Sequence, residues 1–315
     1  MRIATLLPSA TEIVCALGLA DQVVAVSHEC DYPSEMRGRP VAVHSLVDAA
    51  GRSSGEIDAE VEAALARGDS LYRIDVNTLA AARPDLVITQ DLCEVCALPS
   101  LDVDAIAGAL PGPPRVLRLH PHALDDILSD ILTVGAATGR EAAARGVVAG
   151  LRERIARVEA AVRGLTRPRM FCMEWLDPPF CGGHWMPELV WLAGGEEVLG
   201  RPNRPSVRIA WAEIARAQPD VIVLTLCGFD VARTLREVSA VAARPEWQSL
   251  PAVRAGRVYA ADGSSYFSRS GPRIVDGLEI LATILHPEAA AWPTPPESWT
   301  PLGAAAASPP GPAAT

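Results

Sequence analysis

Two cysteines at C-x-x-C spacing are the first residues in this chain whose pattern indicates chemistry. Cys93 and Cys96 end the stretch VITQDLCEVC (87–96), and Cys30 and Cys227 also follow apolar runs. Thiolates bind zinc and iron–sulfur clusters, and four thiolates are a common complete ligand set. The pattern therefore makes these four cysteines a candidate metal site. Two other interpretations stay open, a redox or reactive pair and purely structural thiols.

Polar side chains also gather in the stretch HECDYP (28–33). His28, Glu29 and Asp31 surround Cys30, and imidazole groups can join thiolates around a metal ion. A surface loop accommodates the same residues without any function, so both interpretations stay open.

Several carboxylates could serve in acid/base catalysis, and they keep an enzyme alternative open. The candidates are Glu29, Asp91, Glu174 and Asp177. The sequence carries no Ser–His–Asp order, P-loop or dinucleotide fingerprint, so no particular reaction is indicated, and a non-catalytic role is favoured.

The elements that position these residues alternate between short apolar runs and helical periods. This alternation predicts parallel sheets flanked by helices. The expected strands are 2–7, 22–27, 85–90, 115–119, 168–175, 220–226 and 257–262. The expected helices are about 10–19, 141–163, 186–194, 211–217, 230–243 and 271–286.

The two halves of the chain echo each other. ARPDLVITQDLC (82–93) and AQPDVIVLTLCG (217–228) both read as a helix end, Pro-Asp, an apolar strand and then cysteine. This indicates two similar α/β lobes joined by one rigid helix, with convergent α/β patterning as the alternative. The expected parts are an N-terminal lobe (1–122), a helical connection (123–165), a C-terminal lobe (166–290) and a disordered Pro/Ala-rich tail (291–315).

Parallel sheets bind ligands at the carboxyl ends of their strands, where all the polar loops named above are expected to lie. Pro8 and Ser9 indicate a helix start there, and Pro187 indicates a second one. Helix N-termini suit carboxylate, amide or phosphate groups of a ligand, although simple capping is the alternative.

Composition excludes some classes of partner. The 315 residues are 49% hydrophobic and 21% charged, with a formal net charge of −10 and no Lys/Arg-rich run. Nucleic acid is therefore not expected as a partner. No run of 18 apolar residues occurs and no secretory leader is visible, so we expect a cytoplasmic protein without membrane insertion.

Three stretches resemble a known family. RIATLLPSATEIVCALGLADQVVAVSHECDYP, the long central helix and GHWMPELVWLAGGEEVLG are similar to periplasmic substrate-binding proteins of the cobalamin (vitamin B12)/iron-siderophore type. The likeness covers roughly residues 1–288, and it is stronger still to a leaderless subgroup of cobalamin-binding proteins. It implies a class III periplasmic-binding-protein fold, with two Rossmann-like lobes joined by one rigid helix. It also implies a corrinoid or metal-chelate ligand, in particular cobalamin, held between the lobes without catalysis for uptake, storage or delivery.

The resemblance, together with the loop positions, defines the expected ligand-binding residues. Aromatic side chains would pack on a flat corrin, arginines would pair with its polar groups, and His28 or His184 could bind its cobalt. The set is Pro8, Ser9, Ala10, Thr11, His28, Glu29, Asp31, Tyr32, Gln90, Asp91, Glu174, Trp175, Gly183, His184, Trp185, Gly228, Phe229, Asp230, Tyr266, Phe267 and Arg269.

Two further expectations follow from the departures from that family. The alternative function is a cytosolic metalloprotein or enzyme with a zinc ion or iron–sulfur cluster on Cys30, Cys93, Cys96 and Cys227 in the same place. An ABC transporter permease is expected as a partner only if the protein is exported, which would require a misplaced start codon and a periplasmic or other extracytoplasmic location.

Overall fold

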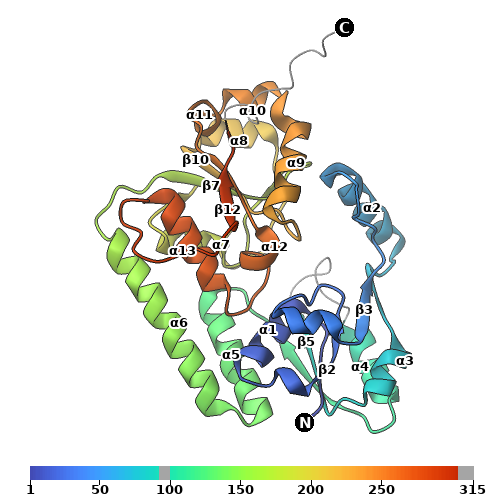
Figure 1. Cartoon of the computed structure of the whole chain (residues 1–315). Coiled ribbons are helices and arrows are strands. Elements are labelled where there is room, and N and C mark those ends of the chain that lie inside the picture. Colours follow the sequence, from blue (N-terminus) through green and yellow to red (C-terminus); the bar gives the residue numbers. More distant parts are fainter. Residues whose placement is uncertain (92–99, 304–315) are drawn as a thin grey trace. The chain divides into compact units, whose positions relative to one another are not determined.

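The chain folds into two compact α/β units. A computed structural model describes residues 1–91 and 100–303 (Figure 1). Unit 1 comprises Met1–Arg52, Ala59–Arg152 and Ser270–Pro272, and unit 2 comprises Ser53–Asp58, Glu153–Arg269 and Arg273–Thr315. Each unit has its own six-stranded sheet.

The sheet of unit 1 has the strand order β4-β3-β2-β1-β5-β6. All its neighbouring pairs are parallel except β3 with β4, which is antiparallel. The strands are β1 (Ile3–Thr5), β2 (Val23–Ser27), β3 (Val41–Ser45), β4 (Tyr72–Ile74), β5 (Leu86–Gln90) and β6 (Arg115–Leu119). The four strands expected here from apolar runs are confirmed, while β3 and β4 add an edge that the sequence did not indicate.

Helices cover both faces of this sheet (Figure 1). On one face, Leu79 of α3 and Val103 of α4 pack with Ala4, Ala25 and Val87 of the strands in one buried cluster. The helical segments are α1 (Pro8–Ala16), η1 (Ala20–Gln22), η2 (Ser34–Gly38), α2 (Ser54–Arg67), α3 (Val76–Ala82), α4 (Ser100–Ala109), α5 (Leu124–Thr138) and α6 (Glu141–Val162). The long helix expected at 141–163 is confirmed as α6, and the boundary between the two units falls within it.

The sheet of unit 2 has the order β12-β11-β10-β7-β8, with β9 paired to β7. β7, β10 and β11 are parallel to one another, and they confirm the three strands expected in this half. The strands are β7 (Arg169–Trp175), β8 (Phe180–Cys181), β9 (Glu196–Glu197), β10 (Val221–Leu224), β11 (Val258–Ala261) and β12 (Trp299–Pro301). The helices are α7 (Met186–Leu192), α8 (Trp211–Ala217), α9 (Val231–Ala242), α10 (Pro245–Ser249), α11 (Pro251–Arg254), α12 (Gly263–Tyr266) and α13 (Ile274–Leu285).

The expected disordered tail from residue 291 needs correction over the part that the structure describes. β12 pairs antiparallel with β11, and Trp299 lies opposite Ala261. Trp292 is buried, and its indole N–H donates to the carbonyl of Glu279 at 3.0 Å. The Pro/Ala-rich composition suggested disorder in spite of these two tryptophans. Their apolar area and the indole N–H donor of Trp292 attach residues 292–301 to unit 2.

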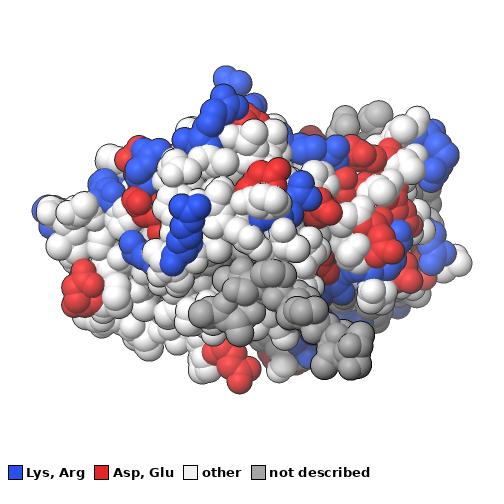
Figure 2. Space-filling view, turned by 90° about the horizontal axis from the view of Figure 1, so that it is seen from above, with Lys and Arg blue, Asp and Glu red and all other residues white. Residues whose placement is uncertain are grey.

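Charge on the surface is mixed. Figure 2 shows basic and acidic side chains interspersed over the face that it presents. The sequence contains no lysine, so all 28 basic residues are arginine. Guanidinium groups bind carboxylates through two parallel hydrogen bonds, and several such pairs recur below.

None of the helices in the described part of the chain is long and apolar enough to cross a membrane.

The turn between α5 and α6 depends on a glycine. A Cβ atom on Gly135 would lie 2.4 Å from the Cβ of Ala144, closer than side chains approach one another. The carbonyl of Gly135 also accepts the N–H of Arg140 at 2.7 Å, which closes the turn. The two helices can therefore meet at this distance only because residue 135 lacks a side chain.

We expect Gly135→Ala to destabilise unit 1 by about 1–3 kcal/mol, because the added methyl overpacks the α5–α6 contact. The matched control is Gly146→Ala in α6, where a Cβ would meet nothing within 4 Å. That change should stabilise the protein by about 0.5–1 kcal/mol through helix propensity. Urea unfolding followed by circular dichroism measures both, and equal midpoints for the two variants would contradict the packing argument.

Candidate functional site

The carboxyl edge of unit 1 begins with the first turn of α1. Pro8 is half-buried, whereas Ser9, Ala10 and Thr11 are buried. The hydroxyl of Thr11 lies 2.7 Å from the hydroxyl of Thr5 and 3.0 Å from the sulfur of Cys30. Thr11 thus joins the ends of β1 and β2 inside unit 1. Its expected contact with a ligand stays a prediction.

A short segment from late in the sequence lies on this edge. Ser270–Pro272 belongs to unit 1. The hydroxyl of Ser270 donates to the side-chain carbonyl of Gln90 at 3.3 Å, and both side chains are buried. A Cβ on Gly271 would lie 3.5 Å from the backbone of Ser9, so the segment packs directly on the start of α1.

The loop after β2 is more open. His28, Glu29 and Tyr32 are exposed and Asp31 is half-buried, as a contact surface requires. The ring nitrogen Nδ1 of His28 lies 3.2 Å from the carbonyl of Val43, so the imidazole is oriented by its neighbour strand. The expected contact of these four residues with a ligand stays a prediction.

Sequence reasoning missed two histidines at the end of β6. His120 contacts the carbonyl of Asp91 through Nδ1, and its Nε2 lies 2.9 Å from Nε2 of His122. Behind them, burial together with the nearby charge of Asp126 raises the pKa of Asp130 to about 7. The sequence signal was the pair LHPH directly after an apolar run, at the same edge as Gln90.

Unit 2 presents an aromatic stack at the ends of β7 and β10. The rings of Trp175 and Phe229 lie 5.2 Å apart, and the guanidinium of Arg233 lies 4.7 Å from the ring of Phe229. Gly228 has a φ of 75°, which a side chain would disfavour, and this turn places Phe229 beside Trp175. Asp230 caps α9 by accepting the N–H of Arg233 at 2.6 Å. We call Trp175 and Phe229 the aromatic platform.

Glu174 positions the loop that follows β8. One carboxylate oxygen accepts the N–H of Gly183 at 3.1 Å, and the other accepts the hydroxyl of Ser206. A Cβ on Gly183 would lie 2.3 Å from the N of Ser206, so only glycine fits. The next residue, His184, is held at a φ of 48°, an uncommon conformation for a residue with a side chain. Such backbone strain is often found at functional sites.

The third loop of unit 2 follows β11. Its residue Phe267 is buried, and the carbonyl of Phe267 accepts the indole N–H of Trp185 at 3.0 Å. Arg269 is also buried and donates to the hydroxyl of Ser264 at 3.4 Å. Tyr266 is half-buried, and burial raises its pKa. Trp185, Phe267 and Arg269 therefore form the framework, while Tyr266 is the more accessible of this group.

A half-buried carboxylate, Glu197, lies behind the Glu174 loop. Glu197 accepts three backbone N–H groups, from Cys172 at 2.9 Å, Leu199 at 3.1 Å and Gly200 at 3.0 Å. These donors favour the ionised form, but burial outweighs them and, with the nearby charge of Glu174, raises the pKa of Glu197 to about 7.

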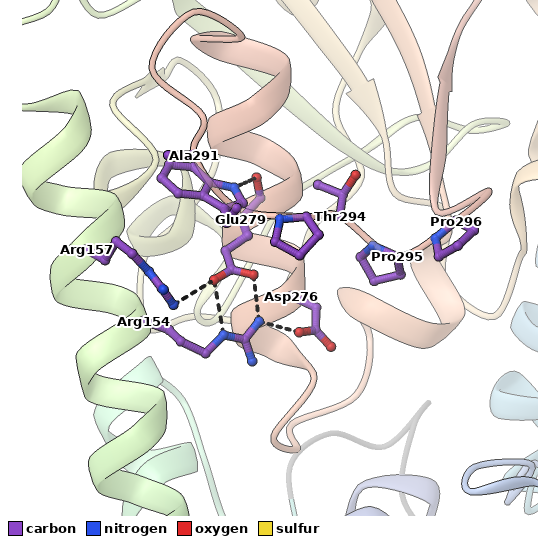
Figure 3. A pocket seen from close by; sticks show the side chains of 10 residues that line it. Arg154, Arg157, Asp276, Glu279, Ala291, Thr294, Pro295 and Pro296 are labelled. Atoms are coloured by element: carbon purple, nitrogen blue, oxygen red, sulfur yellow. Dashed lines mark hydrogen bonds and ion pairs between the residues drawn. The ribbon is translucent and has the colours of Figure 1, made fainter.

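A cavity of about 480 Å³ lies elsewhere in unit 2, between α6, α13 and residues 291–296. Figure 3 shows Arg154 and Arg157 pointing at the buried carboxylate of Glu279, with Asp276 on the other side of Arg154. Arg154 donates to Glu279 through Nε at 3.1 Å and through Nη2 at 2.7 Å. The charged groups of this cavity bind each other, so it is a structural junction rather than a ligand site.

The predicted four-cysteine metal site finds no support. Cys30 is buried in unit 1, Cys227 is exposed in unit 2, and Cys93 and Cys96 lie outside the described residues. Over residues 1–91 and 100–303, no group of three or more His, Cys, Asp or Glu side chains is arranged to hold a metal ion. Cys172 and Cys181 are buried with raised pKa values, as expected of structural thiols.

Two α/β units, each with aromatic and polar loops at the carboxyl edge of a mainly parallel sheet, define a class of ligand-binding proteins. The chain belongs to the periplasmic binding protein family, whose profile matches residues 3–264. It is therefore a substrate-binding protein, and the family and fold expected from the resemblance are confirmed.

Relatives in sequence cover most of the chain. It is 25% identical over 299 residues to an uncharacterized ABC transporter substrate-binding lipoprotein of Bacillus subtilis, YvrC, spanning 91% of this chain and 80% of that protein. It is 24% identical over 280 residues to a vitamin B12-binding protein of Vibrio parahaemolyticus, spanning 88% of this chain and 86% of that one.

Solved structures share the fold. A periplasmic heme-binding protein from Pseudomonas aeruginosa has a TM-score of 0.71 at 18% identity, with 95% of this chain and 97% of that chain covered. The periplasmic vitamin B12-binding protein BtuF of Vibrio cholerae has a TM-score of 0.64 at 21% identity, with 92% and 98% covered.

Glu197 should make stability depend on pH. Its pKa is raised from 4.5 to about 7, so its stabilising contribution is fully present below pH 4.5 and is lost as the pH rises to about 7. We expect the unfolding free energy of the wild type, relative to Glu197→Gln, to fall by roughly 2–3 kcal/mol over that range. Urea unfolding of both proteins from pH 4.5 to 8 measures this, and a constant difference would refute the assignment.

Arg154 should be needed for the stability of unit 2. Arg154→Met leaves the carboxylate of Glu279 buried, with only Arg157 at 3.8 Å. We expect a loss of about 1–3 kcal/mol, because the buried carboxylate of Glu279 loses a partner that is itself half-buried. Arg152→Met on the same helix breaks an exposed pair with Asp125 and should change stability by less than about 0.5 kcal/mol. Similar unfolding midpoints for both variants would rule out this role.

Proposed function

We propose that this protein binds a corrinoid, in particular cobalamin, without catalysing a reaction, and supplies it to a partner. The observation that carries the proposal is the aromatic platform of Trp175 and Phe229, backed by Arg233 and positioned at the carboxyl edge of unit 2. A corrin is flat and apolar on its faces with amide groups on its rim. Aromatic side chains suit the faces, and polar loops suit the rim.

Relatives support the ligand class. Several proteins that match most of this chain at 23–25% identity are vitamin B12-binding proteins. Proteins of the same fold bind vitamin B12 or heme, and both ligands are flat macrocycles that hold a metal ion. The shared chemistry is recognition of such a macrocycle, and the sequence relatives favour the corrinoid.

The partner follows from the same relatives. One sequence relative is an ABC transporter substrate-binding lipoprotein, so an ABC transporter permease is the proposed recipient of the ligand. In a second form of this proposal, the protein acts in the cytoplasm and stores or delivers the ligand there.

Titration with cyanocobalamin, followed by calorimetry and by the corrin absorbance, tests the proposal. We expect saturable binding at one site, which Trp175→Ala weakens by about 5–10-fold, because one stacking partner of the ligand is lost. Trp191→Ala is the matched control, since Trp191 is 58% exposed on α7 and lies outside the predicted set. Absence of cyanocobalamin binding at high micromolar concentration would refute the corrinoid, and binding of hemin instead would reassign the ligand.

A further inference from the structure

We propose that Ser53–Asp58 forms a latch on the aromatic platform of unit 2, and that a ligand must release this latch before it can accept a hydrogen bond from the indole N–H of Trp175. The segment belongs to unit 2, although the residues before and after it in sequence belong to unit 1. The competition with a ligand rests on the proposed function, whereas the latch itself is a property of the protein alone.

The first turn of α2 is capped within the latch. The hydroxyl of Ser53 donates to the carboxylate of Glu56 at 2.8 Å, and the N–H of Glu56 points back at that hydroxyl at 3.3 Å. The N–H of Ser53 also donates to that carboxylate at 2.8 Å, so this Ser-x-x-Glu capping box satisfies N–H groups at the N-terminal end of the helix locally. The N–H of Ser54 is not part of it and bonds elsewhere.

Glu237 on α9 receives that N–H. Its carboxylate accepts the N–H of Ser54 at 2.8 Å and pairs with Arg233 at 3.1 Å. Ser54 has no exposed surface, and Glu237 is 7% exposed. A charge-assisted bond to a helix N-terminus in a buried setting is a specific anchor.

The latch touches the platform directly. The indole N–H of Trp175 donates to the carbonyl of Ser54 at 3.2 Å. Gly55 packs on Asp177, whose carboxylate would lie 3.2 Å from a Cβ at that position. At the far end, Arg208 donates to the carboxylate of Asp58 at 2.8 Å. Ser54 therefore occupies the edge of Trp175 that carries its single hydrogen-bond donor.

The docked latch is also incompletely satisfied. The hydroxyl of Ser54 is buried and has no hydrogen-bond partner among the described residues. A buried hydroxyl without a partner disfavours the docked state, because release would return it to water. Docking thus rests on a few polar contacts and is opposed by the hydroxyl of Ser54, which lacks a hydrogen bond. This balance suits a contact that opens and closes.

Coupling to a ligand follows from competition for the indole N–H of Trp175, which Ser54 holds in the docked state. A ligand that takes this donor binds only the released state, so its apparent affinity is reduced by the fraction of molecules that are latched. Variants that weaken the latch without touching the platform should therefore bind the ligand more tightly.

Ser54→Pro tests the hydrogen bond from the N–H of Ser54 to the carboxylate of Glu237. Proline is well tolerated in the first turn of a helix, and it removes the N–H that Glu237 accepts. Ser54→Ala is the matched control, because it keeps the N–H and removes only the unsatisfied hydroxyl. Asp58→Asn weakens the second anchor, to Arg208, by removing the negative charge that Arg208 pairs with, and it covers the case in which Ser54→Pro fails to fold.

Two measurements on the ligand-free protein decide whether the latch exists. We expect hydrogen exchange of the amides of residues 55–58 to rise at least tenfold in Ser54→Pro and in Asp58→Asn, but not in Ser54→Ala. Hydroxyl-radical footprinting should show greater oxidation of Trp175 in the same two variants. Unchanged exchange and unchanged oxidation in both would overturn the latch.

Cyanocobalamin binding decides whether the latch regulates the site. We expect the dissociation constant to fall about threefold or more in Ser54→Pro and Asp58→Asn. Weaker binding in these variants would overturn the competition and make the segment part of the ligand contact. If cyanocobalamin binds none of the proteins while the exchange results hold, the proposed ligand fails and the latch stands.

Discussion

Unit 2 depends on carboxylates removed partly or wholly from water that accept hydrogen bonds from backbone N–H groups and from arginine. Glu174 fixes the loop at Gly183, Glu197 fixes the turn at residues 199–200, and Glu237 receives the start of α2. A carboxylate with several oriented donors holds a loop more rigidly than apolar contact does, because the geometry of each bond is directional. The raised pKa of Glu197 shows the opposing effect, since burial penalises the charge that makes these bonds strong.

This arrangement explains why the aromatic platform can be both rigid and reachable. Phe229 is buried under Arg233, and Trp175 is only half-buried at the end of β7. The rigid framework is supplied by residues that were expected to contact the ligand, such as Glu174 and Trp185, whose polar groups are already used by the protein. In the proposed site, contact with a ligand would fall to fewer residues than the sequence suggested, and those residues would be held in place by the others.

The sequence predicted the parallel strands whose apolar runs are continuous, because such a run is a strong local signal. The edge at which the loops lie then follows from the rule that the carboxyl ends of parallel strands meet at one edge of a sheet. It did not predict β4 or β12, which are three residues long and depend on their partner strands. It also could not predict the bond between Ser54 and Glu237, which are 183 positions apart. Cys30 gives a related case. Cys30 follows a strand end as a metal ligand would, yet its sulfur accepts a hydrogen bond from Thr11 inside the unit.

Both carboxyl edges carry a short segment whose sequence neighbours belong elsewhere. Ser270–Pro272 lies on Ser9 and Gln90 in unit 1, and Ser53–Asp58 lies on Trp175 in unit 2. In each case the protein's own hydroxyl and carbonyl groups occupy polar positions that a ligand's amide or carboxylate could fill. Binding would then exchange one set of hydrogen bonds for another, so affinity would depend on the difference between them rather than on their sum. A site built in this way rejects small apolar molecules, because they would displace the segment without replacing its hydrogen bonds.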